Sequence, residues 1–270
     1  MLSQARREVG VSPVLRVRIT DRRAHRDRIS ARSAFIRLKK ITQQYGIQLR
    51  KIARHVDDIV KGFDASTPEG QRLIQGHLRR YGDTLDHWAQ SAADLMVSRV
   101  AAADGERWRR QSREIGAGLE REIRSANIAP AMAQMKADQV RLIKSLPAEA
   151  ADRVYQVALK GVTNGLRAEA IADEIYQTGA VTRSRASLIA ETEISRSATT
   201  LQMARAQSVG STAYIWRTAG DRVVRHDHAV LNGQTFRWDD PPIADQRSGA
   251  RAHPGCIYRC RCIAEPIITD

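Results

Sequence analysis

The residues best suited to chemistry lie close together near the end of the chain. All three cysteines fall within residues 256–262, in the pattern C-x-x-x-C-x-C. Three of the seven histidines lie in the adjoining stretch, namely His226, His228 and His253. Thiolate sulfur and imidazole nitrogen are the ligands that Zn²⁺ prefers in proteins. Any soft-ligand chemistry is therefore expected between residues 226 and 262.

Four of these side chains could hold Zn²⁺ in an ordinary tetrahedral site. They are His228, His253, Cys260 and Cys262. The two cysteines flank Arg261 in a segment with strand character, so both thiols should point to the same face. A site with four protein ligands is closed and structural. Cys256 is the expected substitute ligand if one of the four is absent.

A packing role is the alternative for the same residues. C-x-C is not the usual C-x-x-C zinc spacing, and buried reduced cysteines often serve as small hydrophobic side chains. His228 and His253 would then hydrogen-bond carbonyl groups of the loops. An odd number of crowded cysteines does not resemble the disulfide framework of a secreted domain. The sequence leaves metal binding and packing open.

Long helices should precede this region. Apolar residues recur at steps of three and four between residues 36 and 59, which predicts a helix ended by Gly62. Thr67 followed by Pro68 predicts the start of the next helix. A third helical segment around Trp108 contains glycines at 116 and 118, and Ala129-Pro130 ends it. These stripes with charged outer faces predict an antiparallel helical bundle whose aromatic residues are buried.

A second helical block should begin at Pro147. Gly179 is expected to end one short helix, and Thr182 to cap a longer one that stops at Gly210. Within that helix Glu191 and Glu193 point to different faces, so a salt-bridged surface is expected.

Short strands should follow Gly210. Residues 213–218, 234–238 and 260–268 have strand character, and a Pro- and Gly-rich loop of residues 239–255 separates the last two. A loop of that length is usually functional or held in place. The predicted fold class is α+β: a mainly α-helical N-terminal region, then a small α+β domain with a minimal sheet. The expected division is a basic flexible arm over 1–28, a helical region over 29–146 and a C-terminal domain over 147–270.

Composition narrows the classes of function. The chain of 270 residues has a net charge of +14, of which residues 1–50 contribute +10. A cationic leader on a near-neutral body indicates either contact with a polyanion such as DNA or a solvated segment. No stretch is apolar enough for a membrane span, and the N-terminus has no secretory h-region. A soluble intracellular protein is expected.

One ordered set of motif residues resembles a known family. The set is Trp216, Asp221, Arg225, His228, Asn232, Gly233, Arg251, His253, Pro254, Cys260 and Cys262. In this order and spacing it resembles the C-terminal domain of the Mu F-like phage head morphogenesis proteins, over roughly residues 150–268. Asp239-Asp240-Pro241-Pro242, expected to form a rigid turn, belongs to the same pattern. Cys256 and His226 depart from it. Asp221, Arg225 and Arg251 are expected to organise the loops through ion pairs and hydrogen bonds.

The resemblance implies a non-enzymatic minor capsid protein of a bacteriophage head. It implies portal and capsid proteins as partners, a place in the head interior or at the portal vertex, and the host cytoplasm during assembly. Some family members are thought to be packaged with the DNA or to accompany it on ejection. Packaged double-stranded DNA would meet the basic arm. Some relatives carry a toxin or nuclease module after this domain, and none is expected here because the sequence ends at Asp270.

Two other classes compete with this interpretation. The run RHDHAVLNG suggests a metal-dependent His-Asn-His nuclease, but Asn232 follows His228 too closely for a strand hairpin to separate them. His253 precedes Pro254 in a loop, whereas that chemistry needs its last histidine on a helix. The remaining alternative is nonspecific, salt-sensitive DNA binding through residues 1–50.

Overall fold

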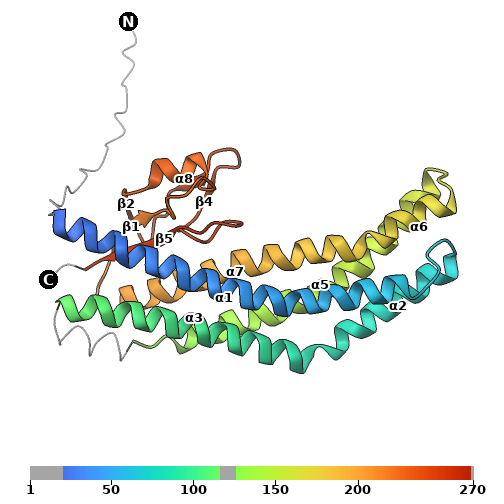
Figure 1. Ribbon diagram of the computed structural model, residues 1–270, viewed down its shortest axis with the longest axis horizontal. Helices are drawn as coiled ribbons and strands as arrows, with labels where there is room; N and C mark the ends of the chain where they lie inside the picture. The colour runs from blue at the N-terminus through green and yellow to red at the C-terminus, as the bar shows by residue number, and fades with distance from the viewer. Residues whose placement is uncertain (1–20, 116–125, 269–270) are drawn as a thin grey trace, which may run out of the picture.

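The computed structural model describes residues 21–115 and 126–268, and the side chains of residues 33–110 and 126–268 (Figure 1). The helices are α1 (Asp21–Lys61), α2 (Pro68–Thr84), α3 (Asp86–Ile115), α5 (Ala129–Thr163), α6 (Ala168–Tyr176), α7 (Thr178–Ser208) and α8 (His226–Leu231). The strands are β1 (Ala213–Arg217), β2 (Thr235–Arg237), β3 (Ile243–Asp245), β4 (Ala250–Arg251) and β5 (Ile263–Ile267). The predicted α+β class is confirmed.

Long helices form an elongated bundle with the small sheet at one end (Figure 1). Helix α1 has 41 residues, which at 1.5 Å per residue makes it about 60 Å long. It packs along α7, while α2 and α3 pack against α5. Most of the predicted stripe on α1 is buried, although Ile36 at its start is exposed. Tyr45 lies in the core, and its hydroxyl donates to Gln139 Oε1 at 3.0 Å. None of the helices in the described part of the chain is long and apolar enough to cross a bilayer.

The sheet has its own core, which one bundle helix helps to build. Strand β1 lies between β2 and β5, and both pairings are antiparallel. Tyr214 and Trp216 alternate along β1 and are fully buried. Trp108 of α3 packs in the same cluster with 0% of its surface exposed. The bundle and the sheet are therefore joined through the interior.

The capping prediction at residue 67 is confirmed. Helix α1 ends at Lys61, just before Gly62, and Thr67 is the N-cap of α2. The Thr67 hydroxyl accepts a hydrogen bond from the Gly70 N–H at 3.0 Å. Such a cap satisfies one of the donors that the first turn of a helix leaves unpaired.

The prediction that Pro147 opens a new helix is wrong. Helix α5 begins at Ala129 and runs through Pro147 to Thr163 without interruption. The proline ring is buried and packs beside Gly82 of α2, where a Cβ would lie 3.4 Å from Pro147 Cγ. Packing of the ring offsets the backbone hydrogen bond that a proline removes.

The boundary between α6 and α7 also differs from the prediction. Helix α6 already ends at Tyr176, and α7 begins at Thr178, so Gly179 and Thr182 both lie inside α7. A Cβ on Gly179 would lie 2.2 Å from Asp57 Oδ1 of α1. The glycine is needed for a close approach of two helices, not for a helix end.

Two sequence predictions fall partly on residues that are not described. Helix α1 already begins at Asp21, so residues 21–28 are helical, while residues 1–20 of the expected arm lie outside the described residues. The glycines at 116 and 118 lie outside them as well. The division at residue 146 stays a prediction, and α5 crosses that position as one helix.

Candidate metal centre in the C-terminal region

Three of the predicted ligands come together in the interior of the C-terminal region. His228 of α8, Cys260 and Cys262 are all buried, and their ligand atoms lie within 4.8 Å of one another. The two cysteines directly precede β5. Arg261 between them is exposed and binds Asp221 with both terminal nitrogens at 2.7 Å. In an extended chain, neighbouring side chains point in opposite directions, so the side chains of Cys260 and Cys262, two positions apart, lie on the same side.

The contacts of His228 fix the orientation of its ring. Nε2 lies 3.0 Å from the carbonyl oxygen of Ala244 in β3. Because a carbonyl oxygen can only accept, Nε2 carries a proton, and Nδ1 is the ring nitrogen that faces the two sulfurs. Nδ1 lies 3.5 Å from Cys260 Sγ and 3.6 Å from Cys262 Sγ. A metal-binding histidine usually donates its other ring N–H to a carbonyl or carboxylate in this way.

These distances match the edges of a zinc tetrahedron. Zn–N bonds of about 2.0–2.1 Å and Zn–S bonds of about 2.3 Å at a tetrahedral angle place nitrogen and sulfur about 3.6 Å apart. Both nitrogen–sulfur distances in the cluster thus fit a shared Zn²⁺.

The pKa values of the two clustered thiols are shifted in opposite directions. A hydrogen bond from the Cys262 thiol, helped by His228, lowers the pKa of Cys260 well below its ordinary value. The same bond and burial raise the pKa of Cys262. The pair therefore releases its first proton easily and its second with difficulty. The Gly255 N–H also points to Cys260 Sγ, at 3.3 Å, and stabilises negative charge there.

A tight turn places that N–H. Gly255 has φ +80°, and a Cβ on it would lie 2.9 Å from the Ser195 carbonyl oxygen of α7. The Thr199 hydroxyl donates to the Pro254 carbonyl oxygen at 2.5 Å. The turn is therefore pressed against α7, and only glycine fits at its second position.

His253 and Cys256 do not join this cluster. His253 Nδ1 lies 3.1 Å from the Tyr214 hydroxyl, and its ring packs edge-on to that of Tyr214. Burial lowers the pKa of His253, and a hydrogen bond with the Trp238 backbone partly opposes this. Burial likewise raises the pKa of the half-buried Cys256 thiol to about 12. The expected set of four ligands is thus reduced to three within the described residues.

The other motif residues organise the loops around the cluster. Arg225 donates to the Tyr258 carbonyl oxygen at 2.6 Å, and Arg251 forms an ion pair with Asp240.

The Asn232-Gly233 turn is held against the end of β1. The side-chain oxygen of Asn232 accepts from the Thr218 N–H at 3.0 Å. Further contacts are the Gly233 N–H to the Trp216 carbonyl oxygen at 2.8 Å and the edge-on packing of the Trp216 and His228 rings. Hydrogen bonding to Arg261 lowers the pKa of Asp221.

Sequence reasoning missed two features near the cluster. The long loop contains the hairpin β3–β4, which supplies the Ala244 carbonyl, and its short strands have little alternation to reveal them. Glu193 is buried, unlike the paired surface residue Glu191. Its carboxylate accepts from Gln139 at 3.1 Å and from Arg196 at 3.0 Å. Ala186 and Ile189 precede Glu193 by seven and four positions, so they share its helix face, and this spacing could have predicted its burial.

Residues 152–265 match the family described as Phage Mu protein F like protein. This match confirms the predicted resemblance to the Mu F-like family over that part of the chain. The matched region begins inside α5 and contains α7, the sheet and all three clustered ligands, whereas α1, α2 and α3 precede it.

The chain is also similar to a longer bacterial protein. The chain is 28% identical, over 215 residues, to an uncharacterised protein of Haemophilus influenzae. The aligned part covers 79% of this chain and 46% of that relative, so the chain spans about half the relative's length. No solved structure matches the chain.

Proposed function

We propose that the protein is a minor capsid component that acts in phage head morphogenesis at the portal vertex and catalyses no reaction. The observation that carries the proposal is the Mu F-like match over the region that contains the cluster. The cluster is suited to holding a fold together, because His228 is only 2% exposed and its Nε2 is engaged by Ala244. Neither ring nitrogen faces solvent to act on a substrate.

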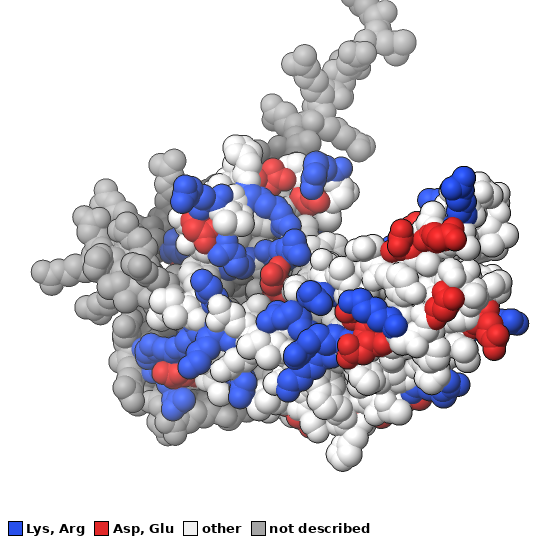
Figure 2. Space-filling view, turned by 45° about the vertical axis from the view of Figure 1, so that its right-hand side comes forward, with Lys and Arg blue, Asp and Glu red and all other residues white. Residues whose placement is uncertain are grey.

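The proposed contact with packaged DNA rests on charge. Residues 1–50 carry 13 Lys and Arg against 3 Asp and Glu. On the face shown in Figure 2, Lys and Arg side chains gather over the left half and the centre. Each phosphate that a Lys or Arg side chain neutralises releases a counterion, so the basic residues of the segment 1–50 would add affinity for DNA that does not depend on base sequence.

The proposed cofactor is one Zn²⁺ held by His228 Nδ1, Cys260 and Cys262, which are three protein ligands in place of the expected four. The burial of all three ligands, and not a complete ligand set, supports a structural role. When bound, the metal would tie α8 to the start of β5 across the hairpin β3–β4. A three-stranded sheet with short strands gains little stability from its own hydrogen bonds, so a metal tie is useful there.

Mass spectrometry of purified heads tests the proposed location. A tagged copy of the protein should enter assembled heads at low copy number and co-purify with the portal protein. A matched copy lacking residues 152–265 should do neither. Heads and portal complexes that assemble without any tagged protein would contradict the proposal.

A further inference from the structure

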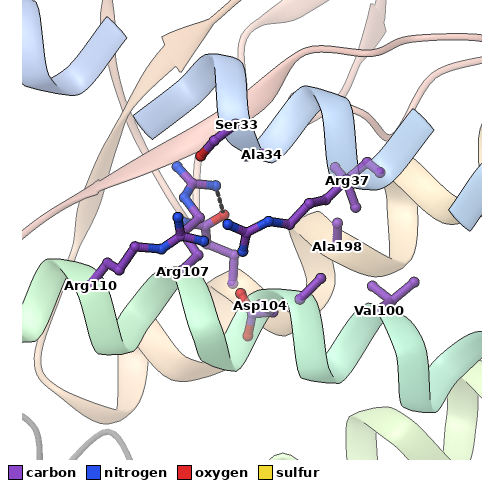
Figure 3. Close-up of a pocket in the computed structure, with 11 residues that line it drawn as sticks. Ser33, Ala34, Arg37, Val100, Asp104, Arg107, Arg110 and Ala198 are labelled. Atoms are coloured by element: carbon purple, nitrogen blue, oxygen red, sulfur yellow. Dashed lines mark hydrogen bonds between the residues drawn. The ribbon is translucent and has the colours of Figure 1, made fainter. Parts of the chain in front are cut away.

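A small arginine-lined cavity lies between α1, α3 and α7, away from the cysteine cluster (Figure 3). Its volume is about 30 Å³, enough for about two water-sized atoms. Its walls include Arg37 of α1, Arg107 and Arg110 of α3, and Gln202 of α7. Figure 3 shows the guanidinium groups of these arginines turned toward one another.

Two buried donors at this cavity lack an acceptor among the described residues. They are Arg107 Nε and Gln202 Nε2. The remaining nitrogens of Arg107 are engaged, one with Gln202 Oε1 at 2.5 Å and one with the Ala264 carbonyl oxygen at 3.1 Å. Gln202 is only 3% exposed. An unpaired buried N–H is costly, and a bound acceptor in the cavity would satisfy both donors.

The charges around the cavity favour an anion. Five guanidinium groups stand against three carboxylates among the described side chains: Arg37, Arg107, Arg110, Arg205 and Arg217 against Asp104, Glu106 and Glu265. Glu106 is about half exposed and shared by Arg37 at 2.8 Å and Arg110 at 3.4 Å. Asp104 is buried and bound to Arg205 at 2.7 Å. Positive charge remains in excess where the two N–H groups are unpaired.

We propose that the mouth of this cavity binds an oxyanion, namely a single phosphate or sulfate group, with one oxygen of the group inside the cavity. One oxygen accepts from Arg107 Nε and Gln202 Nε2, and the outer oxygens face Arg37 and Arg110. The planar fork of arginine suits the tetrahedral oxygens of such groups. A free phosphate and a backbone phosphodiester of DNA share this chemistry. The site itself does not depend on the proposed role in the phage head.

A sulfate titration of the full chain tests the site directly. The probe is sodium sulfate, followed through the Nε–Hε nuclear magnetic resonance signals of protein labelled with ¹⁵N-arginine. The Arg107 signal is assigned by its loss in Arg107→Lys. It should shift and saturate with sulfate. An Arg107 signal that does not respond would overturn the proposal.

Two variants and one control locate the binding. Gln202→Glu keeps an acceptor for Arg107 but replaces the unpaired donor by a carboxylate oxygen, so sulfate binding should be lost. Arg110→Gln lies at the exposed rim, so folding should be retained, and sulfate should bind about tenfold more weakly. Arg109→Gln makes the same charge change on α3 outside the cavity wall and should leave binding unchanged. Equal weakening by both arginine variants would contradict the site.

A second titration identifies the source of the phosphate. If the ligand is backbone phosphate, a short DNA duplex should shift the same Arg107 signal, and sulfate should compete with the duplex. If inorganic phosphate shifts the signal and the duplex does not, the ligand is the free anion. The DNA result thus bears on the proposed DNA contact, while the sulfate result alone decides the site.

Discussion

At the residue scale, the carbonyl oxygen of Ala244 orients the His228 ring toward the two sulfurs of the cluster. The Nε2–H bond to Ala244 fixes the ring before any metal arrives, so Nδ1 faces the two sulfurs. Hydrogen bonding from Cys262 and His228 lowers the pKa of Cys260, which favours the thiolate form that a metal would need. Ligands that are already oriented and partly deprotonated lose less freedom on binding.

Replacement of one clustered cysteine should remove the metal. Purified protein should contain one Zn²⁺ per chain by elemental analysis, and Cys260→Ser should contain none. The free energy of unfolding should fall by more than about 2 kcal/mol, because the loss removes the tie between α8 and β5. Urea denaturation with and without a chelator measures this change.

The third cysteine provides a matched control for that experiment. Cys256→Ser makes the same substitution outside the cluster, so its zinc content should equal that of the unchanged protein. If Cys256→Ser loses the metal and Cys260→Ser keeps it, the ligand set described above is incorrect.

The Pro254–Gly255 turn should tolerate no side chain. Gly255→Ala combines a positive φ with a Cβ 2.9 Å from Ser195, so unfolding should become easier by about 2–3 kcal/mol. Gly249→Ala has a similar positive φ but nothing within 4 Å, and should cost only about 1 kcal/mol. Chemical denaturation of both variants separates steric contact from backbone strain, and equal losses would show that the contact is unimportant.

Part of the cluster was predictable from residue spacing. The C-x-C pattern places two sulfurs on one side of an extended chain, and His228 is the nearest preceding buried histidine. His253 was not separable from it by sequence, because its partner Tyr214 lies on β1, 39 positions away. That pairing depends on how the sheet and the loop pack, which no local pattern reveals.

At the element scale, periodicity predicted the helices well and their ends less well. The stripe on α1 and the cap at Thr67 are local features, so sequence determines them. Pro147 and Gly179 were predicted to mark helix ends, but both lie inside helices. Each of them packs against a neighbouring helix that no local sequence pattern reveals. The proline ring packs against α2 beside Gly82, and Asp57 occupies the space that a side chain at 179 would need.

The close approach of α1 and α7 should depend on Gly179. Gly179→Ala would gain helix propensity, but its Cβ would lie 2.2 Å from Asp57 Oδ1 and 2.6 Å from Asp57 Cβ. We expect a net loss of about 1–2 kcal/mol in unfolding free energy. Gly76→Ala in α2 meets only the end of Arg80 and should be stabilising by about 0.5–1 kcal/mol. A stabilised Gly179→Ala protein would contradict the close packing.

At the scale of the whole molecule, a buried ion pair connects α3 with α7 beside the sheet. Arg205 binds Asp104 at 2.7 Å, and both side chains are largely buried. Burial raises the pKa of Asp104 to about 6, although Arg205 and Arg107 oppose the shift. Folding therefore favours the protonated carboxyl relative to the unfolded chain, whose ordinary aspartate pKa is 3.8.

This shift predicts a defined pH dependence. Between about pH 4 and pH 6 the folded state binds more protons at Asp104 than the unfolded state, so stability should fall as pH rises through that window. Asp104→Asn removes the titration. The stability of the unchanged protein relative to this variant should fall by up to about 3 kcal/mol from pH 4 to pH 6.5. Urea denaturation at several pH values tests this, and a constant difference would refute it.

DNA affinity should depend on salt through the N-terminal residues. Residues 1–20 contain Arg6, Arg7, Arg16 and Arg18. Each arginine that contacts a phosphate adds about 0.9 to the slope of log affinity against log salt. Removal of residues 1–20 should lower the slope by up to about 4, measured by fluorescence anisotropy on a duplex. An unchanged slope would show that these residues do not touch DNA.

The position of Trp108 has a practical consequence for anyone who dissects this chain. The indole belongs to α3, well before the Mu F-like match begins, yet it fills the interior of the sheet. A fragment expressed from residue 152 would start in the last third of α5 and would carry an empty pocket the size of a tryptophan ring. Such a fragment should aggregate or be digested quickly by protease, and adding back a peptide that spans α3 should protect it.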